Sequence, residues 1–364
     1  MLDIKPYKVQ AVAQLLGTST VNVRRMLDES GIDVVRQEHG PKTRIFSAEN
    51  IFDLARHQAM RKTKDRRGDR KQVVATVYAP KSAVGKTMLT GNFALCFGLR
   101  GLRTLSIDLD LQADLTLSFG YNADLTPEEA VESGIPRSRL VENHFGNLMP
   151  NWPMGRRTLP EVAKKPYGEN GPHLVPADVT LDRLDAMLSY EDLDQKNAAR
   201  DRMLAQLLQD GRAKKDPNFD TSEYDIVLFD APSSTTRITR CALLASDFVI
   251  CPVSMEHNSS KGLSYLSSVL AQMHDQFGRS PELIIVANFF DSASVHVMTQ
   301  LSTVMQTYKQ SLLQCWIRRS GDFPKAIDHV SDSPLVLSKP SCSATSDLMG
   351  CAHALLARMG MMNA

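Results

Sequence analysis

The spacing of apolar residues changes near residue 72 and divides the chain into two parts. In the first part, apolar residues recur every three or four positions, which predicts short amphipathic helices. One helix begins at Val9 and stops at Gly17, and a second is capped within 18–20 and ends at Gly31. A third is capped at Ser47. We therefore expect a small helical domain over residues 1–60.

Residues 61–71 carry seven Lys or Arg against two Asp. We interpret this stretch as a basic, solvated linker that could add contacts to phosphates. After it, nearly continuous apolar runs at 73–79, 104–108, 225–230, 248–253 and 283–288 alternate with helical segments such as 87–99. Such runs are typical of parallel strands that are buried on both faces. The pattern predicts an α/β domain over residues 72–364 with a doubly wound, mostly parallel sheet. Residues 122–175 are polar and rich in Pro and Gly, so short helices and loops are expected there.

Composition narrows the class of protein. The chain has 364 residues, 43% of them apolar, and a net charge of +1, so any surface for nucleic acid must be local. Six cysteines are scattered without a C-x-x-C pair, which favours reduced thiols over a disulfide framework or a zinc site. The first residues lack the apolar run of a signal peptide, and no stretch approaches a membrane span. We expect a cytoplasmic protein.

The strongest chemical signal is the segment 80–87, which ends in Gly-Lys-Thr. In a phosphate-binding loop, backbone N–H groups and the start of the next helix face the phosphates. Lys86 then reaches the phosphates and the Thr87 hydroxyl ligates Mg²⁺. The usual first glycine is Pro80 here, and Ser82 and Ala83 occupy two other common glycine positions. The alternative is a chance Gly-Lys-Thr at the start of a helix.

Two further strands end in carboxylates. Asp230 follows four apolar residues and is predicted to hold Mg²⁺ through a water. Asp108 and Asp110 end the second strand, at the rim where open α/β sheets bind ligands. Taken alone, these two are equally well interpreted as acids at the edge of a loop. Their order along the chain, after the loop at 80–87, favours a nucleotide site.

Together these segments resemble the ParA-type partition ATPases, a deviant Walker A class related to MinD and to nitrogenase iron proteins. Residues 81–87 match the family's K-G-G-V-G-K-[TS] at five of seven positions. Residues 108–112 and 230–233 resemble D-x-D-P-Q and D-x-P-P, with Leu111 and Ser233 in place of prolines. The segment 251–253, followed by Glu256, resembles the strand and loop that border the base. The resemblance covers roughly residues 72–350.

The resemblance implies a slow ATPase that uses ATP, ADP and Mg²⁺. The implied nucleotide contacts are Lys81, Ser82, Ala83, Val84, Gly85, Lys86, Thr87, Met88, Asp230, Pro252 and Asn288. The expected metal-site residues are Thr87, Asp108 and Asp230, and the expected catalytic residues are Lys81, Lys86 and Asp110. In the family, the signature lysine, here Lys81, crosses the interface of an ATP-bound homodimer, and Asp110 would orient the attacking water. If Ser82 and Ala83 need positive φ, the loop is strained and hydrolysis is slow or defective.

The resemblance also implies partners. The ATP-bound dimer would bind DNA without sequence preference, and a ParB-like centromere-binding protein would stimulate hydrolysis, which places the protein on the nucleoid. Candidates for the nonspecific DNA surface are Arg318, Arg319, Lys325 and Lys339, although each of them, taken alone, is better interpreted as an ordinary solvated charge.

The N-terminal region resembles a winged, MerR-like helix-turn-helix domain, as in larger partition ATPases that repress their own operon. Its helices are followed by a turn at Gly40, which would form the wing. Arg24, Arg25, Lys42 and Arg44 are the candidate DNA contacts. The alternative is a helical dimerisation cap with no role at DNA.

Two other functions stay open. A MinD-like positioning ATPase would need a basic amphipathic C-terminal helix, whereas residues 351–362 are apolar with one Arg, so no membrane partner is expected. A transcriptional regulator that senses nucleotide with little hydrolysis is the second alternative.

Overall fold

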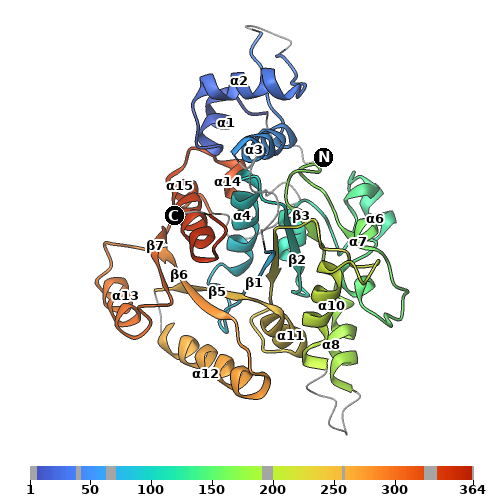
Figure 1. Cartoon of the computed structure of the whole chain (residues 1–364), viewed down its shortest axis with the longest axis vertical. Helices are drawn as coiled ribbons and strands as arrows, with labels where there is room; N and C mark the ends of the chain where they lie inside the picture. The colour runs from blue at the N-terminus through green and yellow to red at the C-terminus, as the bar shows by residue number, and fades with distance from the viewer. Residues whose placement is uncertain are drawn as a thin grey trace.

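A parallel β-sheet forms the centre of the molecule (Figure 1). The computed structural model describes residues 6–37, 42–62, 71–190, 200–255, 259–323 and 334–362. Seven strands pair in the order β3-β2-β4-β1-β5-β6-β7, and every registered pair is parallel. Their bounds are β1 Val73–Val77, β2 Thr104–Asp108, β3 His173–Val175, β4 Ile226–Asp230, β5 Phe248–Ser254, β6 Glu282–Phe290 and β7 Leu312–Arg318. The predicted α/β fold with a parallel sheet is confirmed.

Helices cover both faces of the sheet because alternate strand residues point to opposite sides. Val73, Ala75 and Val77 pack in one core, with α4 (Lys86–Leu99), α14 (Leu335–Ser338) and α15 (Ser343–Arg358). Val74 lies on the opposite face of the sheet and shares a second core with α8 (Leu181–Tyr190), α10 (Met203–Arg212) and α11 (Arg237–Ala245). Within the described residues, this domain also contains α5 Asp114–Ser118, α6 Pro127–Glu132, α7 Leu159–Val162, α12 Ser259–Phe277 and α13 Val295–Thr307, with short 3-10 helices at Arg137–Arg139 and Phe145–Leu148. Because β2, β4 and β1 are neighbouring parallel strands, their carboxyl ends lie at the same rim of the sheet.

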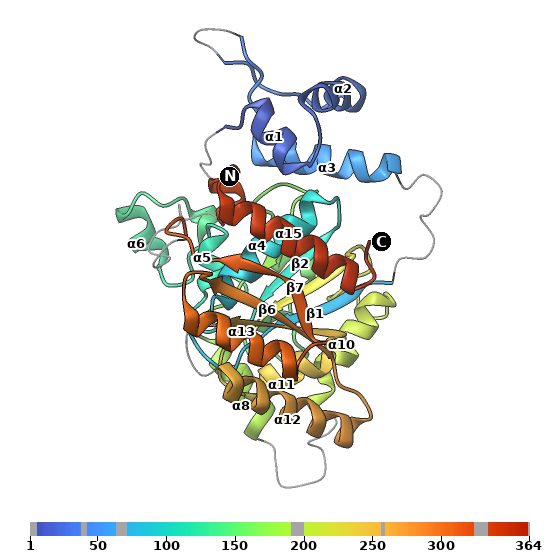
Figure 2. The same ribbon diagram turned by 90° about the vertical axis from the view of Figure 1, so that its left-hand side faces the viewer.

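Three N-terminal helices lie across one end of the sheet domain (Figure 2). They are α1 Val9–Leu15, α2 Thr20–Ser30 and α3 Ala48–Lys62. Helix α3 packs on α4, where Gly98 lies against Phe52 and the carbonyl of Gly101 accepts a 2.8 Å hydrogen bond from Arg56 Nη1. The Tyr7 hydroxyl donates to the Leu337 carbonyl at 2.9 Å. The N-terminal helices thus share one hydrophobic core with α4 and α15.

The short strand contacts of this N-terminal part are isolated bridges. Tyr7 pairs with Phe46 and Arg36 pairs with Arg44, both antiparallel. The predicted wing turn at Gly40 and most of the predicted linker, residues 63–70, lie outside the described residues. Helix α3 continues to Lys62, so the first two linker positions are helical. The winged helix-turn-helix assignment and the domain boundaries stay predictions.

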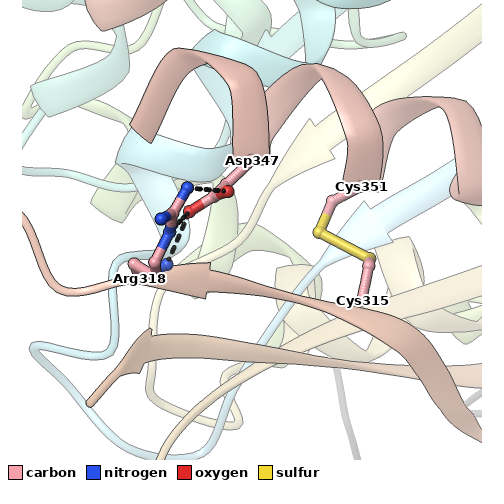
Figure 3. Close-up of a disulfide and its surroundings, with 4 residues drawn as sticks. All are labelled: Cys315, Arg318, Asp347 and Cys351. Atoms are coloured by element: carbon pink, nitrogen blue, oxygen red, sulfur yellow. Dashed lines mark hydrogen bonds and ion pairs between the residues drawn. A yellow bond between two sulfur atoms is a disulfide. The ribbon is translucent and has the colours of Figure 1, made fainter. Parts of the chain in front are cut away.

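One expectation about the cysteines is wrong. Cys315 on β7 and Cys351 on α15 form a disulfide, with 5.7 Å between their Cα atoms (Figure 3). These residues are 36 positions apart, and only the packing of α15 against β7 brings them together. Spacing along the chain carried no signal of this pair. The other cysteines, Cys96, Cys241, Cys251 and Cys342, are unpaired.

Candidate functional site

The connection from β1 to α4 needs unusual backbone angles. Gly85 has φ +86° and forms the N-cap of α4, and Ala83 has φ +58°. A Cβ on Gly85 would lie 2.5 Å from Asn288 Nδ2, closer than van der Waals contact allows. Glycine is therefore required at position 85 both by its left-handed backbone and by the neighbouring amide. Ser82 does not have positive φ, so the predicted strain falls on Ala83 alone.

Lys86 begins α4 and is held by a hydroxyl from the neighbouring strand end. Its side chain is buried, and its Nζ donates a 2.5 Å hydrogen bond to Ser233 Oγ, in the loop after β4. One turn along α4, Thr90 Oγ1 donates to Asp230 Oδ1 at 2.7 Å. Helix α4 and the end of β4 are thus joined by polar contacts from both Lys86 and Thr90.

Asp230 is fully buried at the carboxyl end of β4. Its Oδ1 is bound by Thr90, but its Oδ2 is buried and accepts no hydrogen bond within the described part of the chain. Burial raises the pKa of Asp230 to about 7, although the hydroxyls of Thr90 and Thr87 and the charge of Lys86 act against this rise. A buried carboxylate oxygen without a partner is costly, and a cation bound there would remove the cost.

Asp108 lies beside Asp230 on the neighbouring strand, in register with it. Its Oδ2 accepts hydrogen bonds from the backbone N–H and hydroxyl of Thr116, at 2.9 and 2.7 Å, and its Oδ1 accepts from the backbone N–H of Asp110 at 3.1 Å. Burial first, and the charge of Asp230 second, raise the pKa of Asp108 well above its ordinary value. Both oxygens of Asp108 therefore hold the backbone after β2, and its predicted metal contact stays a prediction.

Asp110 is half-buried, and its Oδ1 accepts from the backbone N–H of Gln112 at 3.2 Å. Asp114, at the start of α5, was not among the predicted residues. Burial and the nearby charge of Asp110 raise the pKa of Asp114, whereas the charge of Lys86 lowers it. Asp110, Asp114 and Lys86 are therefore electrostatic neighbours. The only signal in the sequence for Asp114 was its closeness to the 108–112 segment.

Three other polar residues of the site were also missed. They are the hydroxyl residues Thr90, Thr116 and Ser233, each of which binds a group named above. Thr90 follows the Gly-Lys-Thr segment by one helical turn, which is a signal that the sequence offered.

The side of the loop toward β5 and β6 is less polar. Asn288 Nδ2 donates to the Val84 carbonyl at 2.9 Å, while its Oδ1 is buried without a hydrogen-bond partner in the described ranges. Lys81 has an exposed side chain and lines, with Pro252, a small cavity of about 30 Å³. Met88 packs near the position that a Cβ on Gly85 would occupy. Asn288 thus supports the loop backbone, and a contact with a base stays a prediction.

Two of the four predicted DNA-contacting residues in the N-terminal region bind other side chains. Arg25 donates to Asn22 Oδ1 at 2.6 Å, and Arg44 pairs with Asp28 at 3.2 Å. Arg24 and Lys42 are exposed and form no hydrogen bond or ion pair with any described residue. Two of the four predicted cations therefore point at no carboxylate.

The predicted C-terminal surface is also neutralised in part. Arg318 binds both carboxylate oxygens of Asp347, at 2.7 and 2.8 Å (Figure 3). Lys339 donates to Asp322 at 2.9 Å. Arg319 follows β7, and Lys325 lies outside the described residues. A bidentate Arg–carboxylate pair satisfies much of the hydrogen-bonding capacity that a phosphate would use.

Comparisons with known proteins show which proteins this chain is similar to. A family model described as "AAA domain" matches residues 72–284, which contain the loop and the ends of β1, β2 and β4. Over 359 residues the chain is 22% identical to the cell division protein PomZ of Myxococcus xanthus, covering 98% of this chain and 95% of PomZ. It is 25% identical over 256 residues to a ParA family protein of Chlamydia trachomatis, covering 70% of this chain and 85% of that protein.

A solved structure shows the same fold. Cobyrinic acid a,c-diamide synthase of Mycobacterium smegmatis, with bound ADP and magnesium, aligns with a TM-score of 0.58 at 21% identity. The alignment covers 80% of this chain and 96% of the synthase. Within the described ranges, no helix is long and apolar enough to cross a membrane.

Proposed function

Since the chain belongs to the AAA-domain family and its relatives include ParA-family proteins, we propose that it is a ParA-like DNA partition ATPase. In this proposal it binds ATP with Mg²⁺, dimerises around the nucleotide and then holds DNA without sequence preference. The observation that carries the proposal is Asp230, whose buried Oδ2 has no hydrogen-bond partner in the described chain and lies at the strand end beside the start of α4.

The residues fit a magnesium nucleotide. The N-terminus of α4 and the backbone of the loop supply positive dipoles for phosphates, and Lys86 adds a full charge. Thr87 and the orphaned oxygen of Asp230 provide oxygen ligands for a hard cation, directly or through water. When bound, Mg²⁺ would compensate the negative charge of the phosphates. The groups named here come from the β1–α4 loop, the first turn of α4 and the end of β4.

The remaining roles follow from where the side chains lie. Lys86 is held by Ser233, so we infer that it exchanges this hydroxyl for phosphate oxygens on nucleotide binding. Asp108 fixes the backbone of Asp110, which then accepts a hydrogen bond from the attacking water. Lys81 has an exposed side chain on the outer part of the loop, where it can reach a second copy of the chain. There it compensates charge as an arginine finger does.

Turnover measurements test this proposal. Phosphate release is measured with and without DNA in the wild type and in Lys86→Ala. The proposal predicts slow turnover in the wild type and none in the variant. No turnover under any of these conditions, together with intact binding to an operator, would favour the nucleotide-sensing regulator instead.

The MinD-like alternative finds no support in the C-terminal helix. Leu348, Cys351, Leu355 and Leu356 of α15 are buried against β7 and α4, so this helix presents no free apolar face. For the N-terminal region we propose binding to specific DNA through Arg24 of α2 and Lys42 of the segment before α3, with repression of the protein's own operon as the consequence. Replacing both by Ala should abolish operator binding without changing ATP turnover.

The proposed function as a whole implies a cytoplasmic protein that associates with the nucleoid.

A further inference from the structure

A second cavity lies at the opposite end of the sheet from the β1–α4 loop. It has a volume of about 810 Å³ and is lined by residues that precede or begin the strands, including Lys71 and Val74 at β1 and Asp247 at β5. The rest of its wall comes from one face of α10 and from the C-terminal ends of α11 and α12. Because the strands are parallel, their amino ends are remote from the rim that carries Asp108 and Asp230. The cavity is therefore separate from the proposed nucleotide site.

Positive charge dominates this cavity. Its lining contains four cationic side chains, Lys71, Arg202, Arg212 and Arg279, and one carboxylate, Asp247. Arg279 pairs with Asp247 at 3.2 Å. The other three cations form no ion pair with any described residue. Three cations without a carboxylate partner in the described chain give the wall of the cavity a net positive charge, which attracts an anion.

The guanidinium groups are held in place by neutral partners. Arg202 Nη2 donates to the Phe277 carbonyl at 3.5 Å, and its Cζ lies 5.5 Å from the centre of the Phe277 ring. Arg212 Nε donates to Gln72 Oε1 at 3.1 Å, which leaves both of its Nη groups without a bond to the described chain. These contacts fix the positions of the two groups and leave donors for a ligand. Groups positioned in advance lose little entropy when they bind.

The shape of the cavity follows helix α10. Arg202 is the N-cap of this helix and Arg212 is its last residue, with Ala205, Leu208 and Gln209 between them on the same wall. Ten residues of α-helix span about 15 Å. A ligand that contacts both arginines is therefore elongated, and its middle lies over a part of the helix with both apolar and amide side chains, Gln206 and Gln209 among them.

We propose that this cavity is a second anion site, which binds an elongated small molecule that carries phosphate groups and is about the size of a nucleotide. Guanidinium groups suit phosphate oxygens because their donors form a planar fork. Cavities of roughly 300–1,000 Å³ are typical of small-molecule sites. A concave site of this volume suits a small molecule better than a rod-shaped duplex. The site does not depend on the proposed ATPase function.

Titration calorimetry tests the proposal with sodium tripolyphosphate and ADP as the actual probes. The proteins are the wild type, Lys71→Gln with Arg202→Gln, and Lys86→Ala. Both substituted cations of the double variant have exposed side chains, so the variant should fold, as far-UV circular dichroism checks. Lys309→Gln, at an exposed position outside the lining of this cavity, is the control for the loss of one surface charge.

The expected result is a site that survives in Lys86→Ala and Lys309→Gln and is weakened at least about tenfold in the double variant. Equal affinity in the wild type and the double variant would overturn the proposal, as would the absence of any binding in Lys86→Ala. A duplex oligonucleotide forms a separate arm. If the double variant loses only duplex binding while the small probes never bind, the surface is a nucleic-acid contact and the proposal is wrong. Failure of the ATPase proposal gives a different result. In that case Lys86→Ala and the wild type bind ADP equally, because no second ADP site at Lys86 is lost.

Discussion

Replacing Ala83 by glycine tests whether the backbone of the loop between β1 and α4 is strained. Its φ of +58° is left-handed, and its side chain is exposed, so the Cβ gains no burial in return. A left-handed conformation costs a residue with a Cβ roughly 1–2 kcal/mol. Glycine at this position would remove that cost. Ser82, the preceding residue, does not have positive φ and provides a matched control.

The net change can be worked out for each variant. Ala83→Gly gains roughly 1–2 kcal/mol from relief of strain and loses about 0.4–1 kcal/mol because glycine increases the entropy of the unfolded chain. The expected result is stabilisation by roughly 0.5–1 kcal/mol. Ser82→Gly suffers only the loss, so we expect destabilisation by about 0.4–1 kcal/mol. The two substitutions therefore differ in sign.

Denaturation by urea is the appropriate assay. At about 2.1 cal/mol/K per residue, a chain of 364 residues has an unfolding entropy near 0.8 kcal/mol/K, so 1 kcal/mol shifts the melting temperature by only about 1 °C. The free energies of unfolding of both variants and the wild type are compared without nucleotide. Equal destabilisation by Ala83→Gly and Ser82→Gly would refute the reasoning, because position 83 would then not be strained.

Three further predictions concern the same site. Gly85→Ala should destabilise the protein by about 2–4 kcal/mol and prevent nucleotide binding, since its Cβ would meet Asn288 Nδ2 at 2.5 Å. Urea denaturation measures the stability and calorimetry measures the binding. A variant as stable as the wild type would contradict this prediction. Asp230→Asn should flatten the pH dependence of stability in EDTA. The folded pKa is about 7 against an ordinary 3.8, so the wild type loses stability as pH rises between these values, and equal slopes in the two proteins would exclude this cause. Ser233→Ala should tighten nucleotide binding about fivefold by releasing Lys86, whereas weaker binding would show that Ser233 contacts the nucleotide.

The buried strands were predictable because parallel strands covered on both faces have continuous apolar runs. The runs ending at Asp108 and Asp230 predicted both the strands and the carboxylates at their ends. Strand β3 was not predicted, since it has only three residues and lies within a polar, Pro- and Gly-rich region. Strand β7 was missed because its register is irregular and its residues are only partly buried.

Within the site, local motifs predicted residues that lie on the loop, but not residues that act through packing. Ser233 was noted only as a departure from a motif, yet it binds Lys86. The pairing of Cys315 with Cys351 and the docking of α3 on α4 depend on contacts between distant segments. Such contacts leave no periodic or spacing signal in a single sequence.

The most direct test of the central claim is a DNA-binding titration with no nucleotide, with ADP and with ATP, in wild type and Lys81→Ala. The account predicts that the wild type binds nonspecific DNA only with ATP, and that Lys81→Ala loses this binding while any operator binding persists. Normal ATP-dependent binding of nonspecific DNA by Lys81→Ala would contradict the role of Lys81 across the dimer interface, and with it the proposed nucleotide-bound dimer.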